Sequence, residues 1–231
     1  NHGVELNDLV KPQQKKTQIA SDQFRLMSWS GYDLITRHSK VKISCSNNCF
    51  AHGPSVYRAM LTGQPYPLRA MITLSSNPML TQANTRLVYQ ALKSLDLYVV
   101  VDYFLTPSAQ LADYVFPSTS WLERPVVFTW FDTVNIIEVG EAAMPPVAPG
   151  EYERRTDYDF WRGLGLRLGQ ESYWPWPNLE AAYNERLAPL GMTIQELLHK
   201  GGGSAKHGVP ERKYEKVGFG TPSGKAELYS L

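Results

Sequence analysis

Two short polar segments of this chain each follow an apolar run, and both carry side chains suited to holding a ligand. The first is Ser75-Ser76-Asn77-Pro78, which follows the apolar residues 70–74. Ser76 and Asn77 offer a hydroxyl and an amide where the backbone can approach a ligand closely, which suits a phosphate or a sugar. The simpler interpretation, an ordinary turn at Asn77-Pro78, stays open on these residues alone.

The second polar segment begins at Asp102, directly after the apolar residues 97–101. A carboxylate here can accept two parallel hydrogen bonds from the N1–H and N2–H groups of guanine, an edge that adenine does not present. Thr106 and Ser108 can cap the helix that follows, whose N-terminus favours an anion. The structural alternative is that Asp102 only ends a strand or caps the next turn.

The elements around these segments alternate between strand and helix. Apolar runs at 70–74, 97–101 and 114–116 indicate strands, and the apolar spacing of 84–95 indicates a helix. This order predicts right-handed crossovers and a parallel sheet, with strands 70–74 and 98–101 as neighbours and helix 84–95 on one face. In such a sheet ligands bind at the carboxyl ends of the strands, where both polar segments lie.

The predicted fold class is α/β: a parallel-sheet, Rossmann-like nucleotide-binding domain with helical and irregular insertions. Residues 1–55 are interpreted as a partial linker or a remnant of a preceding region, 56–200 as the dinucleotide-binding domain, and 201–231 as a further linker.

The sequence also predicts elements outside the parallel sheet. The predicted strands lie at 24–29 and, as a pair, at 126–128 and 134–139. The predicted helices lie at 56–61, ended by Gly63, at 108–112, and at 157–168, 178–188 and 193–199. A flexible glycine joint is predicted at 201–204 and an extended segment at 213–231.

Composition narrows the classes of function. The 231 residues hold 23 basic and 22 acidic side chains, for a net charge of +1, so no basic excess suggests a nucleic-acid partner. No apolar run approaches the roughly 20 residues of a membrane span. Cys45 and Cys49 are too few for a disulfide framework or a four-thiolate site, and the five histidines show no metal-ligand spacing.

The ordered set of motifs along the chain resembles the molybdopterin oxidoreductases of the dimethyl-sulfoxide-reductase type. The matching segments are Gly63-Gln64-Pro65-Tyr66-Pro67-Leu68-Arg69, Asn77-Pro78, Val99-Val100-Val101-Asp102-Tyr103-Phe104-Leu105-Thr106, Ala112-Asp113-Tyr114-Val115-Phe116-Pro117, Trp121-Leu122-Glu123-Arg124, Pro149-Gly150-Glu151 before Asp159-Phe160-Trp161, and Gly218-Phe219-Gly220-Thr221-Pro222-Ser223-Gly224-Lys225. Each motif is weak alone, and the strength lies in their order and spacing.

The resemblance implies a role for individual residues. In that family two molybdopterin guanine dinucleotides sandwich one molybdenum or tungsten ion, and the part matched here would hold one guanine end. Asn77 would contact the dinucleotide, and Val101 with Asp102 would form the guanine or ribose edge. Arg124, where the family often has Lys, would contact a polar part of the cofactor, and Asp159 would add a contact from its helix. An Arg keeps the charge of Lys but changes the geometry.

The resemblance further implies that the chain is an internal fragment of a catalytic subunit. Two-electron redox chemistry is expected in the full-length enzyme, with an iron–sulfur cluster in an N-terminal part, electron-transfer subunits as partners and a barrel-like domain after residue 231. The fragment itself is expected to be inactive and to hold no metal ligand, and the sequence identifies no catalytic residue in it. A few relatives catalyse non-redox reactions. The alternatives are a stand-alone guanine-nucleotide-binding module and a cofactor-free interaction domain. The compartment, cytoplasmic or periplasmic in a prokaryote, stays open.

Overall fold

A computed structural model describes residues 19–20, 51–128, 136–145, 152–206, 212–219 and 221–228. The predicted strand at 24–29 and the two cysteines lie outside these residues. The chain divides into two compact units, one made of residues 52–127 and 139–203 and the other of residues 1–51, 128–138 and 204–231. The first of these units contains the three parallel strands and all the predicted site residues.

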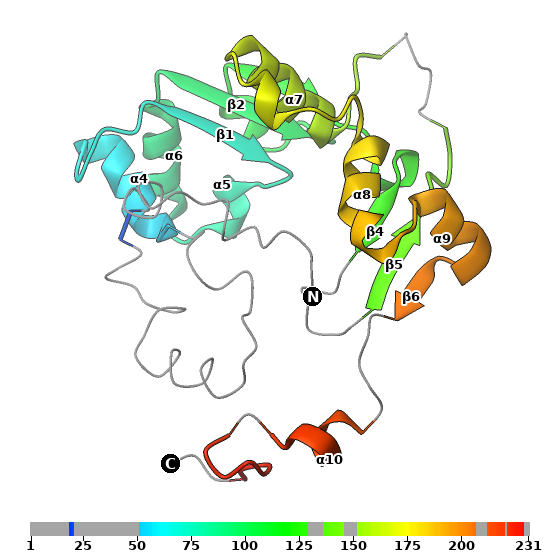
Figure 1. The fold of residues 1–231 in the computed structure, drawn as a ribbon. Helices are drawn as coiled ribbons and strands as arrows, with labels where there is room; N and C mark the ends of the chain where they lie inside the picture. Colours follow the sequence, from blue (N-terminus) through cyan, green and yellow to red (C-terminus); the bar gives the residue numbers. More distant parts are fainter. Residues whose placement is uncertain are drawn as a thin grey trace. The chain divides into compact units, whose positions relative to one another are not determined.

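A parallel sheet of three strands forms the centre of this unit (Figure 1). Its strands are β1 (Ala70–Leu74), β2 (Leu97–Asp102) and β3 (Tyr114–Pro117), in the order β1-β2-β3. Ile72 pairs with Val99 across the first interface, and Val101 pairs with Phe116 across the second. The predicted α/β class, the parallel sheet and the neighbouring positions of strands 70–74 and 98–101 are therefore confirmed.

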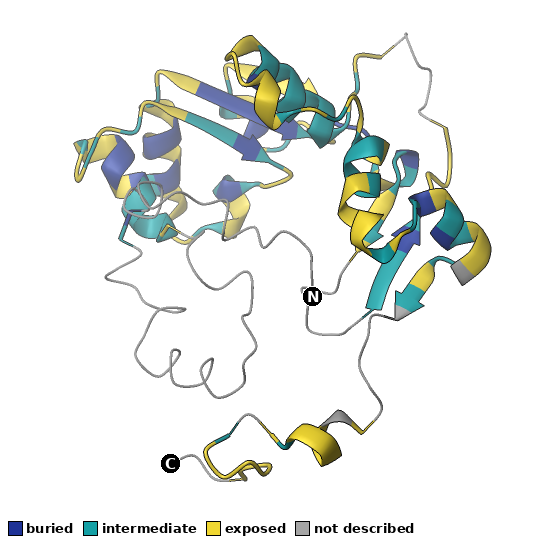
Figure 2. Ribbon diagram, in the orientation of Figure 1, coloured by how far each residue is buried: buried dark blue, intermediate teal, exposed yellow. Residues whose placement is uncertain are grey.

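Two helices cover one face of the sheet. They are α4 (Gly53–Thr62), which ends at Gly63 in the left-handed conformation, and α6 (Thr85–Lys93), whose cap Asn84 accepts a hydrogen bond from the Leu87 amide. Their apolar sides meet β2, which is buried along most of its length (Figure 2). The buried cluster on this face comprises Tyr57, Met60, Val88, Ala91, Leu92, Tyr98, Val100 and Ala109.

The opposite face of the sheet carries α7 (Asp157–Arg167). Side chains alternate along a strand, so Val101 lies on the face opposite Tyr98 and Val100, together with its register partner Phe116. The ring of Phe116 packs against that of Phe160 of α7, with centroids 5.3 Å apart. The sheet therefore has a helix on each face, as expected for crossover connections.

A second sheet contains β4 (Val126–Phe128), β5 (Ile136–Gly140) and β6 (Ser204–Lys206) in that order, which confirms the pairing of the first two. The joint predicted at 201–204 is instead the end of one helix, a turn of two left-handed glycines and the start of β6. This turn is held by a hydrogen bond from the Val139 amide to the Gly203 carbonyl, at 2.8 Å.

The remaining described helices are short. Lys213–Val217 forms a helix, α10, so the extended conformation predicted there is wrong, and an ion pair between Arg212 and Glu215 spans its first turn. The predicted helices near 178–188 and 193–199 are confirmed. The other elements are α5 (Pro78–Thr81), η2 (Ala109–Leu111), η3 (Trp121–Glu123), η5 (Glu171–Tyr173), α8 (Leu179–Leu187), η6 (Ala188–Leu190) and α9 (Ile194–Gly201).

Two glycines of α7 predict opposite effects of substitution by alanine. A Cβ on Gly165 would clash with the indole ring of Trp174 at Nε1, whereas a Cβ on Gly163 would meet only the end of the Arg167 side chain, at 3.4 Å. We expect Gly165→Ala to lower the free energy of unfolding by about 1–3 kcal/mol through overpacking. Gly163→Ala should raise it by up to about 1 kcal/mol through helix propensity. Urea unfolding of both variants tests this, and an equal gain in both would contradict the close packing of Trp174.

Candidate functional site

Three loops meet at the carboxyl edge of the parallel sheet. They run from Ser75 to Asn77 after β1, from Asp102 to Thr106 after β2, and from Ser118 to Arg124 after β3. Backbone hydrogen bonds join neighbouring loops, from Ser75 N to the Val101 carbonyl at 3.0 Å and from Ser118 N to the Asp102 carbonyl at 3.2 Å. This is the edge at which ligands bind in open parallel sheets.

Asn77 lies half-buried at the end of the first loop. Its Oδ1 accepts a hydrogen bond from the Ser108 hydroxyl at 2.7 Å. Its Nδ2 has no hydrogen-bond partner among the residues that the structure describes. The side chain thus uses its acceptor within the protein and keeps two N–H donors for a ligand. Ser76, beside it, is exposed.

Asp102 ends β2 and also shapes the turn that follows. Its Oδ1 accepts hydrogen bonds from the amides of Tyr103, at 2.6 Å, and Phe104, at 3.3 Å. The turn-capping alternative considered for this residue is therefore present in the structure. No described residue donates to Oδ2, so one carboxylate oxygen keeps its capacity to accept from a ligand.

The other two predicted residues of β2 and its loop have protein partners. Val101 is 2% exposed and its carbonyl accepts from Ser75, so only its backbone can face a ligand. Thr106 Oγ1 accepts from the Ala109 amide at 3.2 Å and so caps the short helix, as predicted. Ser108 does not cap that helix, because its side chain is fully buried and bonded to Asn77.

The loop after β3 is anchored by a buried ion pair. Glu123 accepts two hydrogen bonds from Arg154, at 2.9 and 2.7 Å, and a third from the Ser120 amide at 2.8 Å. The Glu123 side chain is only 2% exposed, compared with 26% for Arg154. This contact fixes the position of the adjacent Arg124, which is half-buried.

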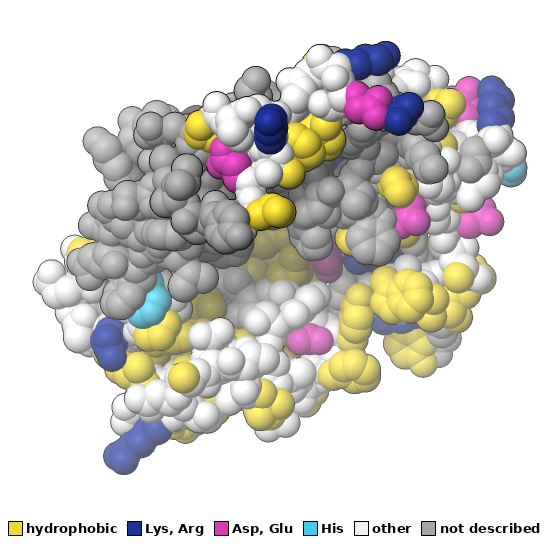
Figure 3. Space-filling model, turned by 90° about the horizontal axis from the view of Figure 1, so that it is seen from below, with side chains coloured by type: hydrophobic (Ala, Val, Ile, Leu, Met, Phe, Trp, Pro, Cys, Tyr) yellow, Lys and Arg dark blue, Asp and Glu magenta, His cyan; other side chains and the backbone are white. Residues whose placement is uncertain are grey.

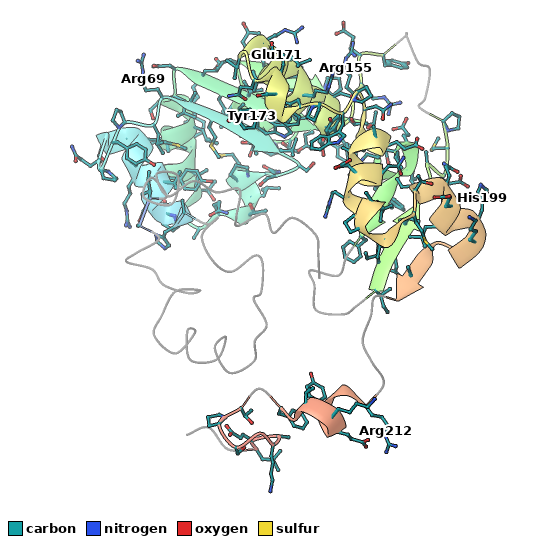
Figure 4. The ribbon with its side chains drawn as sticks, in the orientation of Figure 1. Arg69, Arg155, Glu171, Tyr173, His199 and Arg212 are labelled. Carbon is teal, nitrogen blue, oxygen red and sulfur yellow. The ribbon has the colours of Figure 1, made fainter. Side chains whose placement is uncertain are left out.

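The segment before α7 runs alongside the same loop. Arg155, labelled in Figure 4, donates from its amide to the Pro117 carbonyl and accepts from the Thr119 amide, at 3.3 and 2.9 Å. The Ser118 hydroxyl donates to Asp157 at 2.8 Å. These contacts bring the N-terminus of α7 to the edge where the three loops lie.

Asp159, the predicted site residue in α7, forms a capping box with Thr156. Its Oδ2 accepts from the Thr156 hydroxyl at 2.7 Å and from the Thr156 amide at 3.2 Å. The structure thus gives Asp159 a role in starting α7. Its contact with a cofactor stays a prediction.

The sequence interpretation missed Ser108 as a partner of Asn77 and the pair of Glu123 with Arg154. The spacing Ser120-x-x-Glu123 is a capping-box signal and could have indicated the role of Glu123 within its loop. No local signal indicated Arg154, which is 31 positions away. The structure also places a buried Thr119 hydroxyl, with no hydrogen-bond partner among the described residues, directly after Ser118.

Charged side chains are scattered over the face shown in Figure 3, with both signs present and exposed apolar side chains between them. Within the described ranges, no cluster of three His, Cys, Asp or Glu residues could hold a metal ion. No helix in that part of the chain is long and apolar enough to cross a membrane.

Comparisons with known proteins place this chain in a family. Residues 35–167 match the family described as molybdopterin oxidoreductase. The chain is 32% identical to acetylene hydratase of Syntrophotalea acetylenica over 98% of its length, and 28% identical to the thiosulfate reductase molybdopterin-containing subunit of Salmonella typhimurium over 76%. It spans 31% and 26% of these two relatives, about a third or less of their length.

A solved structure shares both the fold and the sequence pattern. Acetylene hydratase from Pelobacter acetylenicus superposes with a TM-score of 0.78 at 31% sequence identity, over 97% of this chain and 31% of that protein. The matched family region covers more than half of the 231 residues and includes all three strands of the parallel sheet. The chain therefore belongs to the molybdopterin oxidoreductase family.

Proposed function

We propose that the α/β unit binds one guanine end of a bis-molybdopterin-guanine-dinucleotide cofactor, as the Rossmann-like half of a larger catalytic subunit. Family membership implies a molybdopterin cofactor with molybdenum or tungsten. One observation carries the finer proposal: two adjacent strands end in side chains of opposite hydrogen-bonding character. Asp102 keeps an acceptor oxygen for a ligand, and Asn77 keeps two N–H donors.

The side chains at this edge match the polar groups of a guanine dinucleotide. Oδ2 of Asp102 can accept from the N1–H or the N2–H of guanine. Because Oδ1 already accepts from the amides of Tyr103 and Phe104, this one oxygen replaces the two parallel hydrogen bonds expected from the sequence. The Asn77 amide can donate to a phosphate, sugar or carbonyl oxygen. Arg124 adds a positive charge suited to a phosphate or another polar part of the cofactor. Thr106 and the Val101 backbone line the same loop, and Ser76 adds a hydroxyl.

Part of the proposed site depends on the rigid loop after β3. Glu123 and Arg154 hold this loop to the segment before α7, so Arg124 and Asp159 approach the cofactor from fixed backbone positions. The chain's own contribution is therefore binding and orientation of one dinucleotide. Once bound, the metal of such a cofactor supplies the redox or Lewis-acid chemistry.

For the whole protein we propose two-electron oxidoreduction, with an iron–sulfur cluster and electron-transfer subunits as its redox partners. A relative named thiosulfate reductase and another named formate dehydrogenase H, from Escherichia coli, support this class. Hydration of a substrate is the second candidate, because the relative named acetylene hydratase matches over 98% of the chain. Assaying the intact protein for dye-coupled oxidation of formate, dye-coupled reduction of thiosulfate, and formation of acetaldehyde from acetylene separates the two.

The binding proposal predicts the content of the purified protein. We expect the intact protein, prepared without oxygen from a host that makes the cofactor, to release guanine nucleotide and oxidised pterin on acid treatment. Chromatography of the released material measures both per folded chain. Recovery of pterin with cytosine nucleotide or with no nucleotide would overturn the guanine assignment. Absence of both pterin and guanine would favour a cofactor-free interaction domain.

A further inference from the structure

Ser108 is the buried link between the protein core and the half-buried side chain of Asn77. Its hydroxyl donates to Asn77 Oδ1 at 2.7 Å and accepts from the Met79 amide at 3.0 Å. Ser108 itself is 0% exposed, while its two partners are half-buried. A side chain this buried cannot touch a nucleotide, but it can determine which atoms of Asn77 do.

A second buried hydrogen bond lies in the same core. Tyr98 is 1% exposed, and its hydroxyl accepts from Thr73 Oγ1 at 3.1 Å. Burial raises the pKa of Tyr98, while the hydrogen bond with Thr73 partly opposes that rise. This pair is separate from the two hydrogen bonds of Ser108, which hold it to Asn77 and to the Met79 backbone.

This arrangement fixes the polarity of the Asn77 amide. With Oδ1 engaged by Ser108, the two donors on Nδ2 are the part of the side chain left for a ligand. A donor at this position selects an acceptor oxygen and is mismatched to the N–H groups of a base. Asp102, at the end of the neighbouring strand, instead offers a hydrogen-bond acceptor to the ligand.

We propose that Ser108 is a positioning residue that holds Asn77 with its amide N–H groups toward an acceptor oxygen of the bound dinucleotide. This proposal rests on the proposed function, and it gives the two residues different roles. Asp102 accepts hydrogen bonds from the ligand, and Asn77 donates hydrogen bonds to oxygens of the ligand. The oxygen belongs either to the phosphates or to the guanine carbonyl, which share the chemistry that Asn77 recognises.

The first test measures how fast the intact holoprotein loses guanine nucleotide. Ser108→Ala should release it about tenfold faster than wild type, the effect of one lost hydrogen bond. Thr73→Val is the matched control, because it breaks another buried hydrogen bond of the same core, that with Tyr98, without touching Asn77. We expect Thr73→Val to lower the unfolding midpoint but leave the release rate unchanged.

A double variant separates positioning from general loosening of the core. If Ser108 acts through Asn77, the double variant Asn77→Ala with Ser108→Ala should release nucleotide no faster than Asn77→Ala alone. Additive acceleration, or equal acceleration by Thr73→Val, would show that Ser108 only stabilises the fold and would overturn the proposal.

A crystal structure of Ser108→Ala tests the positioning itself, whether or not guanine nucleotide is the ligand. A changed Asn77 rotamer supports the proposal, and an unchanged one refutes it. A wild-type protein without guanine nucleotide would instead contradict the proposed function.

Titrating cofactor-free protein with GDP and with guanosine identifies the oxygen that Asn77 contacts. If Ser108→Ala weakens the affinity for GDP alone, the oxygen belongs to a phosphate. If it weakens the affinity for both, the oxygen is the guanine carbonyl. If Ser108→Ala binds both GDP and guanosine as tightly as wild type does, the proposal is wrong.

Discussion

Replacing Asp102 by Asn should remove most of the guanine nucleotide from the purified intact protein while leaving its fold in place. Oδ1 of Asp102 holds the turn through the amides of Tyr103 and Phe104. An asparagine keeps that acceptor, so the turn should survive. Its new NH2 group takes the place of Oδ2 and faces the donors of guanine. The variant therefore removes the ligand contact and retains the local structure.

The expected loss is large because a charged hydrogen bond is replaced by two opposed donors. Such a change costs on the order of 2–4 kcal/mol, or about 30- to 1000-fold in affinity. If Asp102 only caps the turn, asparagine is an equally good cap and the change should stay within about 1 kcal/mol. Guanine released by acid, normalised to folded protein, distinguishes the two. Equal amounts of bound guanine nucleotide in wild type and Asp102→Asn would refute the role of Asp102 in guanine binding.

A second substitution serves as the control for the turn. Asp102→Ala removes both carboxylate oxygens, so it should lose nucleotide and also loosen the loop from Tyr103 to Thr106. Faster amide hydrogen exchange at Tyr103 and Phe104 in Asp102→Ala, but not in Asp102→Asn, would confirm that the two oxygens have separate roles. Similar exchange in both variants would mean that the turn does not depend on Oδ1.

The parallel sheet could be predicted because its signals are local. Each strand is a short apolar run, the helix between the first two strands has apolar residues at helical spacing, and Gly63 and Asn84 mark helix ends. Together with the handedness of crossovers, these signals leave few arrangements. The errors lie at 201–204 and 213–217. At 204 a strand starts because β6 pairs with the distant β5, and at 213–217 local backbone hydrogen bonds form a helix.

The site could be predicted only to the level of its loops. Sequence order placed Asn77 and Asp102 at strand ends, but it could not show that Asn77 Oδ1 is occupied by Ser108, 31 positions later. Side-chain direction in a short 3₁₀ segment follows from packing, and packing is a property of the assembled core. For the same reason Thr106 and Ser108, both plausible caps by sequence, have different roles in the structure.

The Glu123–Arg154 pair is another contact that no sequence spacing indicates, and breaking it should destabilise the protein strongly. The carboxylate is almost fully buried and accepts hydrogen bonds from the Ser120 amide and from two nitrogens of Arg154. Removing one partner of a buried pair leaves a charge that water cannot solvate, at a cost of about 3–5 kcal/mol. Arg154→Met should cost more than Glu123→Gln, because the Glu123 side chain is 2% exposed and that of Arg154 is 26% exposed.

Urea unfolding of the intact protein measures this effect, with Asp96→Asn as the matched acid-to-amide control. Asp96 pairs with Arg69 at the surface, where both side chains are more than half exposed, so its loss should stay within about 1 kcal/mol. The order expected for the loss of stability is Arg154→Met, then Glu123→Gln, then Asp96→Asn. If Glu123→Gln behaves like Asp96→Asn, the pair does not anchor the loop after β3. The fixed position of Arg124 would then need another cause, because its side chain makes no hydrogen bond or ion pair with the described residues.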